Sequence, residues 1–184
     1  MAATLERLVR QRLAERGLEV NETKSSVTQP GEAWDFLGFR YQGGRIGLAP
    51  TTEKKLKAKT TRLARRLLRW RDRVGAPAEL VVRAFVRRTN LRLYGVRTER
   101  AEFSWATWFL PVVGGAEGLA NLDAHVQREA RYAATGKRTA STQQRIPYGA
   151  LVDAGHLPLV SAYWAARDGG AAYDALVARR TGLG

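Results

Sequence analysis

Several residue types and segment types are absent or scarce in this chain, and each absence excludes a class of function. Cysteine is absent, which excludes disulfide bonds, thiolate metal sites and a cysteine nucleophile. His125 and His156 are the only histidines, which leaves almost no basis for a histidine-based metal cluster. No run of about 18 apolar residues occurs, so the sequence predicts no transmembrane helix. The first residues lack an apolar stretch of signal-peptide length, and we therefore expect a cytoplasmic protein with no membrane partner.

The charge is strongly positive and unevenly distributed. Among 184 residues, 31 are Lys or Arg and 17 are Asp or Glu, which gives a net charge of +14. Residues 53–100 carry 16 basic and 4 acidic residues, whereas residues 1–52 and 101–184 each carry a net charge of +1. Such a concentrated positive segment attracts a polyanion through counterion release, and nucleic acid is the expected partner. Two alternatives are a solvated helical face that keeps the protein soluble and an anionic membrane surface.

Apolar periodicity and turn residues predict an α+β fold that is mostly helical. A hydrophobic content of 45% is sufficient for a packed core in a chain of this length. Short antiparallel strands are expected at residues 18–20, 34–41 and 45–48, with a hairpin turn at Gln42-Gly43-Gly44. Residues 135–145 are polar and predict a loop. Helices are expected at 4–16, 52–74, 77–94, 119–134, 148–154, 157–167 and 171–179.

The basic segment predicts two antiparallel helices with charged outer surfaces. Leu56, Leu67 and Trp70 fall on one face of the first helix, while Val81 and Phe85 belong to the apolar side of the second. The basic residues occupy the remaining surface of both helices. The candidate nucleic-acid contacts are Lys54, Lys55, Lys59, Arg62, Arg65, Arg66, Arg69, Arg73, Arg83, Arg87, Arg88 and Arg92.

Two motifs resemble the end of the palm domain of bacterial reverse transcriptases of the group II intron and retron class. The stretch from Arg16 to Ser25 is similar to the family pattern Gly-Leu-x-Leu-Asn-x-x-Lys-Thr, with Val20 and Ser25 as departures. About ten residues later, Phe36-Leu37-Gly38-Phe39 resembles the hairpin that precedes the basic helical thumb in this family. The resemblance covers about residues 1–95, and parts of the later sequence look like the extension beyond the thumb.

The resemblance implies a domain organisation. Residues 1–50 would be the end of the palm, residues 51–98 a basic helical thumb, and residues 99–184 a helical C-terminal extension. The partner would be an RNA template paired with a DNA primer, held by the thumb through its phosphates. The protein would then be a fragment or subunit of an RNA-directed DNA polymerase, a nucleotidyltransferase.

The resemblance also implies roles for particular residues. Lys24 would lie near the incoming triphosphate, where it could neutralise the pyrophosphate leaving group or donate a proton to it. The alternative for Lys24 is a surface lysine in a turn. The hairpin Phe36, Leu37, Gly38 and Phe39 would be the primer grip, and Gly38 would allow the backbone to approach the primer closely. The same hairpin would also place at least one phenylalanine ring in the core.

The carboxylates that a polymerase needs are missing from this sequence. Two-metal phosphoryl transfer requires several carboxylates that converge on one point, and the chain contains no Asp-Asp pair. Met1 falls where the family continues after its catalytic turn, so we expect the catalytic palm in another polypeptide, the missing N-terminal half. We expect Mg²⁺ only in the complete enzyme and no cofactor or metal bound by this chain alone.

Three further hypotheses concern other classes of function. The chain could be a stand-alone, maturase-like RNA-binding module, or a subunit that docks on another protein through its Trp-rich region 103–111. Ser104, Asp123 and His125 could be assembled into a hydrolytic triad, although nothing in the sequence fixes their geometry. Trp105 and Trp108 lie three residues apart, a spacing compatible with core packing or with base stacking.

The absence of the carboxylates generates a first prediction. In a primer-extension assay with Mg²⁺, the isolated chain should add no nucleotides to an RNA-templated DNA primer. Extension by the purified chain, in a preparation free of other polymerases, would contradict the assignment of the catalytic carboxylates to another polypeptide.

Overall fold

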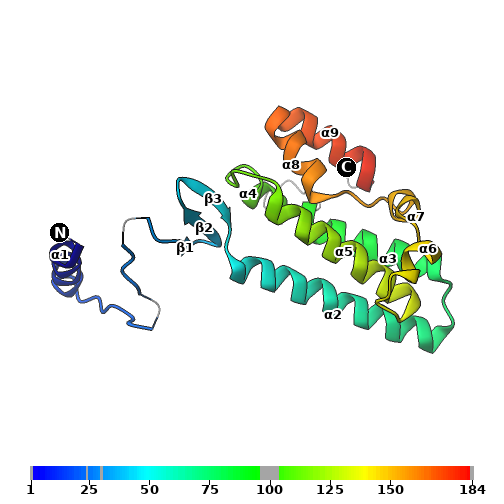
Figure 1. Cartoon of the computed structure of the whole chain (residues 1–184), viewed down its shortest axis with the longest axis horizontal. Coiled ribbons are helices and arrows are strands. Elements are labelled where there is room, and N and C mark those ends of the chain that lie inside the picture. The colour runs from blue at the N-terminus through cyan, green and yellow to red at the C-terminus, as the bar shows by residue number, and fades with distance from the viewer. Residues whose placement is uncertain (1, 24, 30, 96–103, 183–184) are drawn as a thin grey trace.

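The computed structural model describes residues 2–23, 25–29, 31–95 and 104–182, and in these residues it is mostly helical (Figure 1). A small antiparallel sheet with strand order β1-β2-β3 accompanies the helices. This confirms the expected α+β class with predominant helix. The elements are α1 (Ala2–Ala14), β1 (Trp34–Phe36), β2 (Phe39–Gln42), β3 (Arg45–Leu48), α2 (Pro50–Val74), α3 (Ala78–Tyr94), α4 (Trp105–Phe109), α5 (Glu117–Thr135), α6 (Ser141–Arg145), α7 (Tyr148–Asp153), α8 (Leu159–Asp168) and α9 (Gly170–Thr181).

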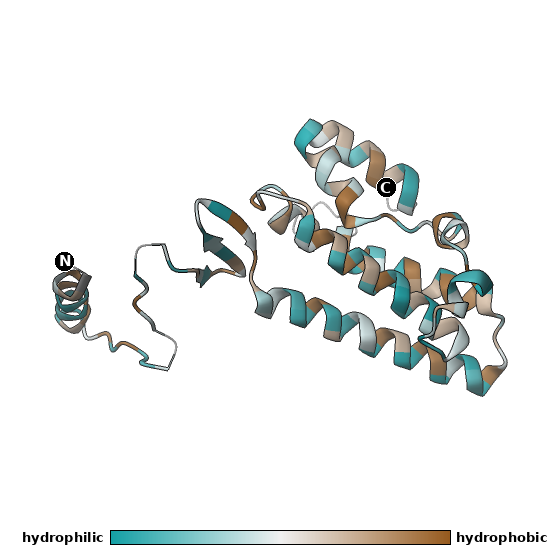
Figure 2. Cartoon of the chain, viewed as in Figure 1, coloured by the Kyte–Doolittle hydropathy of each residue, from teal (hydrophilic) through white to brown (hydrophobic). Residues whose placement is uncertain are grey.

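Three long helices, α2, α3 and α5, pack against one another and form the centre of the fold. Figure 2 shows that hydrophobic and hydrophilic residues alternate along these helices. One end of the core contains Leu67, Phe85 and Val126, one residue from each helix. The other end includes Phe39 of the sheet and Tyr163 of α8. Since α5 lies beyond residue 98 and packs against both basic helices, the expected thumb and extension share one core.

The predicted helical hairpin is present, and its buried faces differ in detail from the expectation. In α2, Leu56 and Leu67 are buried as expected, whereas Trp70 is only partly buried. In α3, the buried residues include Val82, Val86 and Leu93. The sequence pattern predicts a single apolar side for this helix, and these three residues are not part of it. The reason is that α3 contacts α2 and α5 and also α4, α7 and α9, so more than one of its faces is covered.

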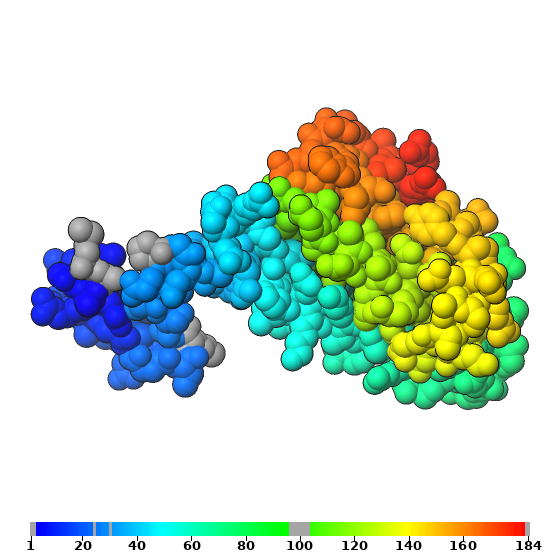
Figure 3. Space-filling view, viewed as in Figure 1, coloured from blue at the N-terminus to red at the C-terminus, as the bar shows by residue number. Residues whose placement is uncertain are grey.

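The N-terminal segment is set apart from the bundle (Figures 1 and 3). In α1, the side chains of Leu5, Leu8 and Val9 are 62%, 50% and 50% exposed. The strand expected at residues 18–20 is not formed. Between α1 and β1, the described residues contain neither helix nor strand. The apolar face of α1 is therefore left uncovered by the residues that the structure describes.

Two other sequence-based expectations were wrong. Residues 34–41 do not form one strand, because the chain reverses at Leu37-Gly38 and divides the segment into β1 and β2. Within the expected loop 135–145, the short helix α6 forms. None of the helices in the described ranges has both the length and the apolar character needed to cross a membrane.

A carboxylate of α5 fixes the start of α8. The backbone N–H groups of Leu159 and Val160 donate hydrogen bonds to the two carboxylate oxygens of Asp123, at 2.7 Å and 3.0 Å. The residue before α8 is Pro158, which supplies no side-chain cap. Burial raises the pKa of Asp123 to about 6, and the two backbone hydrogen bonds oppose that rise. Asp123 therefore acts as a tertiary N-cap that holds α8 against α5.

This cap can be tested by its contribution to stability. Asp123→Ala should lower the free energy of unfolding by about 2 kcal/mol, because one buried and one partly buried N–H group lose their acceptor. The measurement is urea-induced unfolding at neutral pH. Asp153→Ala is the matched control, since Asp153 is exposed and its loss should change the stability by less than about 0.5 kcal/mol. Equal effects of the two substitutions would contradict the cap.

Candidate nucleic-acid interface

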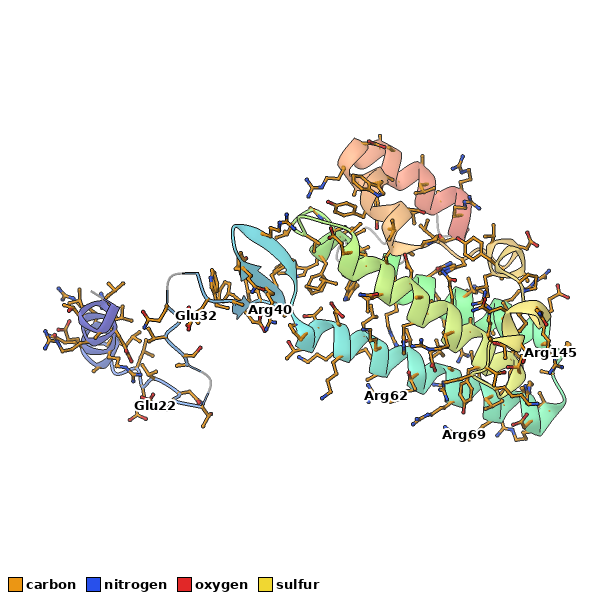
Figure 4. The ribbon with its side chains drawn as sticks, viewed as in Figure 1. Glu22, Glu32, Arg40, Arg62, Arg69 and Arg145 are labelled. Atoms are coloured by element: carbon orange, nitrogen blue, oxygen red, sulfur yellow. The ribbon has the colours of Figure 1, made fainter. Side chains whose placement is uncertain are left out.

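All twelve predicted basic contacts lie on exposed surface. The structure places eight on α2 and four on α3, and each of the twelve is exposed. Figure 4 shows Arg62 and Arg69 on the side of α2 that points away from α5. This arrangement follows from packing, because the apolar residues of α2 and α3 are turned toward the bundle and the charged residues take the opposite side.

Most of these charges form no ion pair within the described part of the chain. Among the described residues, Arg83 is the one candidate with an ion pair, to Glu79 at 2.8 Å. The other eleven candidates make no hydrogen bond or ion pair within the described part of the chain. By contrast, Arg71 of α2 donates to the backbone carbonyl of Ala134 at 2.5 Å and so ties α2 to the end of α5. The outer face of α2 and α3 therefore carries positive charge that the described residues leave largely without ion pairs.

The predicted primer-grip residues form a tight hairpin. Phe36 pairs with Phe39, and Leu37 and Gly38 make the two-residue turn between them. Both turn residues have positive φ, 50° for Leu37 and 89° for Gly38. This combination is typical of type I′ turns, which favour Asn-Gly. Leucine in the left-handed region is uncommon and costs free energy because its Cβ crowds the following carbonyl.

The hairpin turn is attached to the first turn of α2. The carbonyl oxygen of Gly38 accepts hydrogen bonds from the backbone N–H of Ala49 and from Oγ1 of Thr52, each at 2.9 Å. A Cβ at position 38 would lie 2.8 Å from Thr52 Oγ1 and 3.1 Å from the Phe109 ring. Only glycine fits both the backbone conformation and this close approach. The turn and the basic helix are thus held as one unit.

The two phenylalanines of the hairpin have opposite environments. Phe39 is 5% exposed, and its ring packs against Phe109 with centroids 5.1 Å apart. Phe36 and Leu37 are 56% and 63% exposed. This agrees with the expectation that at least one ring enters the core. The exposed tip of the hairpin, Phe36-Leu37, lies near the N-terminal end of α2 and is accessible to a ligand.

Lys24, the candidate triphosphate contact, lies outside the described residues. The neighbouring turn is described: the side-chain Oδ1 of Asn21 accepts hydrogen bonds from the backbone N–H and the hydroxyl of Thr23, at 3.1 Å and 2.7 Å. The asparagine of the family-like motif therefore closes a local turn. The role of Lys24 stays a prediction.

The structure gives each residue of the hypothetical hydrolytic triad a different partner. Ser104 accepts from the Thr107 N–H and caps α4, and Asp123 caps α8. His125 accepts a hydrogen bond at Nδ1 from Arg128, so Nε2 carries the proton and donates to the Lys57 carbonyl at 3.2 Å. Burial lowers the pKa of His125, which favours this neutral form. The contact of His125 with Lys57 ties α5 to α2, and the partners of the three residues do not join them as a nucleophile–base pair.

His156 is also a buried, neutral side chain. Burial, and to a lesser extent the charge of Arg131, lowers its pKa to about 4. In the described part of the chain, no three carboxylate or imidazole groups converge where they could hold a metal ion.

Two features of the interface were not found from the sequence. The first is the strained turn at Leu37, for which the one available signal was a glycine inside an aromatic strand pattern. The second is the position of Trp70, which was assigned to the apolar face of α2 but is only partly buried and lines a surface cleft.

Comparison with protein-family models, curated proteins and solved structures finds no match for this chain.

The turn geometry predicts a conflict between stability and binding. Leu37→Asn should raise the free energy of unfolding by about 1 kcal/mol, because asparagine adopts positive φ at a lower cost than leucine. The same change should weaken binding of an RNA–DNA duplex, because it removes an exposed apolar tip. The measurements are urea unfolding and fluorescence anisotropy of a labelled duplex.

Leu18→Asn is the control for these effects. Leu18 is 55% exposed, and its φ is not positive, so the substitution should give no comparable stabilisation. If Leu37→Asn is no more stable than the wild type, the turn is not strained. If its duplex affinity is unchanged, the tip does not contact the duplex.

Proposed function

We propose that this chain is the duplex-binding part of a reverse transcriptase, with the outer face of α2 and α3 held against a primer–template duplex. The observation that carries this proposal is a set of eleven exposed basic side chains on two adjacent helices, none of which has an ion pair with another described residue. Lysine and arginine on such a face contact phosphates and fix the register of a duplex without reading its sequence.

The dimensions of α2 support a duplex as the ligand. At a rise of 1.5 Å per residue, its 25 residues span about 37 Å. This length is about one helical turn of a nucleic-acid duplex. The hairpin tip lies at one end of this helix, so a strand that follows α2 would reach Phe36 and Leu37.

The N-terminal segment supports the proposal that another polypeptide region binds to this chain. In the family that the sequence resembles, the helix and hairpin before the thumb belong to the palm. The apolar side chains of α1 are exposed here and make a continuous uncovered face of the kind that marks an interaction site. The proposal assigns this face to the catalytic part of the palm, which would supply the carboxylates that this chain lacks.

The docking alternative is less well supported. In the Trp-rich region, Trp105 and Phe109 pack against each other with centroids 4.7 Å apart, and Phe109 packs against Phe39. Phe103 lies outside the described residues. Trp108 is 45% exposed, and a single exposed ring is a small surface for recognition of a protein. The stand-alone RNA-binding alternative uses the same basic face and is distinguished by whether the chain associates with a catalytic palm.

The proposal predicts a specific salt dependence. The affinity of the chain for an RNA–DNA duplex should fall steeply with salt, because each phosphate contact releases a counterion. Replacing Arg62 and Arg69 together by glutamine should reduce the slope of log K against log salt concentration by about 2, since each lost contact removes about 0.9. Anisotropy titrations over a range of salt concentrations measure this slope.

The matched control removes the same charge from another face. Arg179 and Arg180 are exposed at the end of α9, which Figure 1 shows on the opposite side of α5 from α2. The double substitution Arg179→Gln/Arg180→Gln should leave the slope nearly unchanged. An equal decrease of this slope in the two double variants would mean that the total charge, not the α2–α3 face, determines binding.

A further inference from the structure

A cleft of about 660 Å³ lies between the second half of α2 and the middle of α3. Its apolar lining comes from Leu67, Trp70 and Ala84. Leu67 is buried, whereas Trp70 and Ala84 are partly exposed to the cleft. The small side chain of Ala84 leaves space opposite α2 that a larger residue would fill. The cleft is within the range of about 300–1,000 Å³ that is typical of ligand sites.

Four arginines complete the lining. Arg66, Arg69 and Arg73 come from α2 and Arg88 comes from α3. Each is exposed, and none makes a hydrogen bond or ion pair with another described residue. On α2, Arg66, Trp70 and Arg73 are spaced by four and three residues, so they share one side of the helix. An aromatic ring is thus flanked on both sides along α2 by guanidinium groups that have no ion pair among the described residues.

The aromatic ring and the arginines of the cleft together favour one class of ligand. A base stacks on an aromatic ring through its π-face, and arginines neutralise the phosphates on either side of it. An apolar peptide would leave the four charges without partners, and an inorganic anion would not use the indole. A base-paired strand keeps its bases inside the duplex, where they cannot stack on Trp70. An unpaired nucleotide within a strand satisfies both the ring and the charges.

We infer that this cleft binds single-stranded nucleic acid, with an unpaired base stacked on Trp70 and the adjacent phosphates held by Arg66, Arg69, Arg73 and Arg88. The inference rests on the proposed nucleic-acid-binding function and adds a second binding mode to it. Paired segments lie along the outer face of α2 and α3, and an unpaired segment enters the cleft between these helices.

The experiment compares three ligands on the full chain: a short uridine-only RNA strand, a strand of equal length made of abasic units, and a blunt RNA–DNA duplex. Trp70→Leu should weaken binding of the uridine strand about tenfold, the effect of one lost base stack. Its affinity for the abasic strand and for the duplex should be unchanged. Trp70→Phe should retain most of the affinity for the uridine strand, because the smaller ring still stacks.

Two other variants test the cleft without removing the indole. Ala84→Leu should fill the cleft and weaken binding of the uridine strand while leaving every arginine in place. Arg88→Gln should weaken binding of the uridine strand more than Arg87→Gln does, because both residues are exposed on α3 but only Arg88 lines the cleft. Thermal unfolding shows whether each variant is folded.

The outcomes separate the inference from the proposed function. Salt-dependent duplex binding with equal affinities of wild type, Trp70→Leu and Ala84→Leu for the uridine strand overturns the cleft and leaves the duplex face intact. No binding of any ligand overturns both. Competition by uridine monophosphate as effective as that by the strand would reassign the cleft to a free nucleotide and overturn the assignment to a strand.

Discussion

The packing of α5 against both α2 and α3 is the interaction on which the rest of the structure depends. It buries Leu67, Phe85 and Val126 in one core and so fixes which sides of α2 and α3 face solvent. Because the apolar sides are turned inward, the arginines of both helices are left on the outside. The same packing sets the spacing of α2 and α3 and therefore the cleft beside Trp70. The β1–β2 hairpin is attached to these helices by the hydrogen bonds that the Gly38 carbonyl accepts from Ala49 and Thr52.

Concentrating so much positive charge on two adjacent helices carries a cost in stability, because like charges repel in the folded state. The fold offsets this cost with polar contacts that tie the helices together away from the charged face. Arg71 donates a hydrogen bond to the Ala134 carbonyl. The buried Glu129 forms a bidentate ion pair with Arg138, with both N–O distances at 2.9 Å. A nucleic-acid ligand would remove the repulsion, so binding and stability should be coupled.

The local features of this fold could be predicted from sequence, whereas the features that depend on distant contacts could not. Helical periodicity located α2 and α3, and their C-terminal ends at residues 74 and 94 match the expected ranges because local rules govern helix termini. The burial of several faces of α3 was missed, since it depends on α7 and α9, far along the chain. The positive φ of Leu37 was missed as well, because the contact of Gly38 with Thr52 holds a turn that leucine alone does not favour.

The central claim, that the outer face of α2 and α3 binds a nucleic-acid duplex, is tested most directly by site-specific photo-crosslinking. A photoreactive side chain would replace Arg69 on α2 in one variant and Arg179 on α9 in another, and each would be irradiated with a labelled RNA–DNA duplex. The account predicts a covalent adduct from position 69 that disappears at high salt, and little or none from position 179. Equal or stronger crosslinking from position 179 would contradict it.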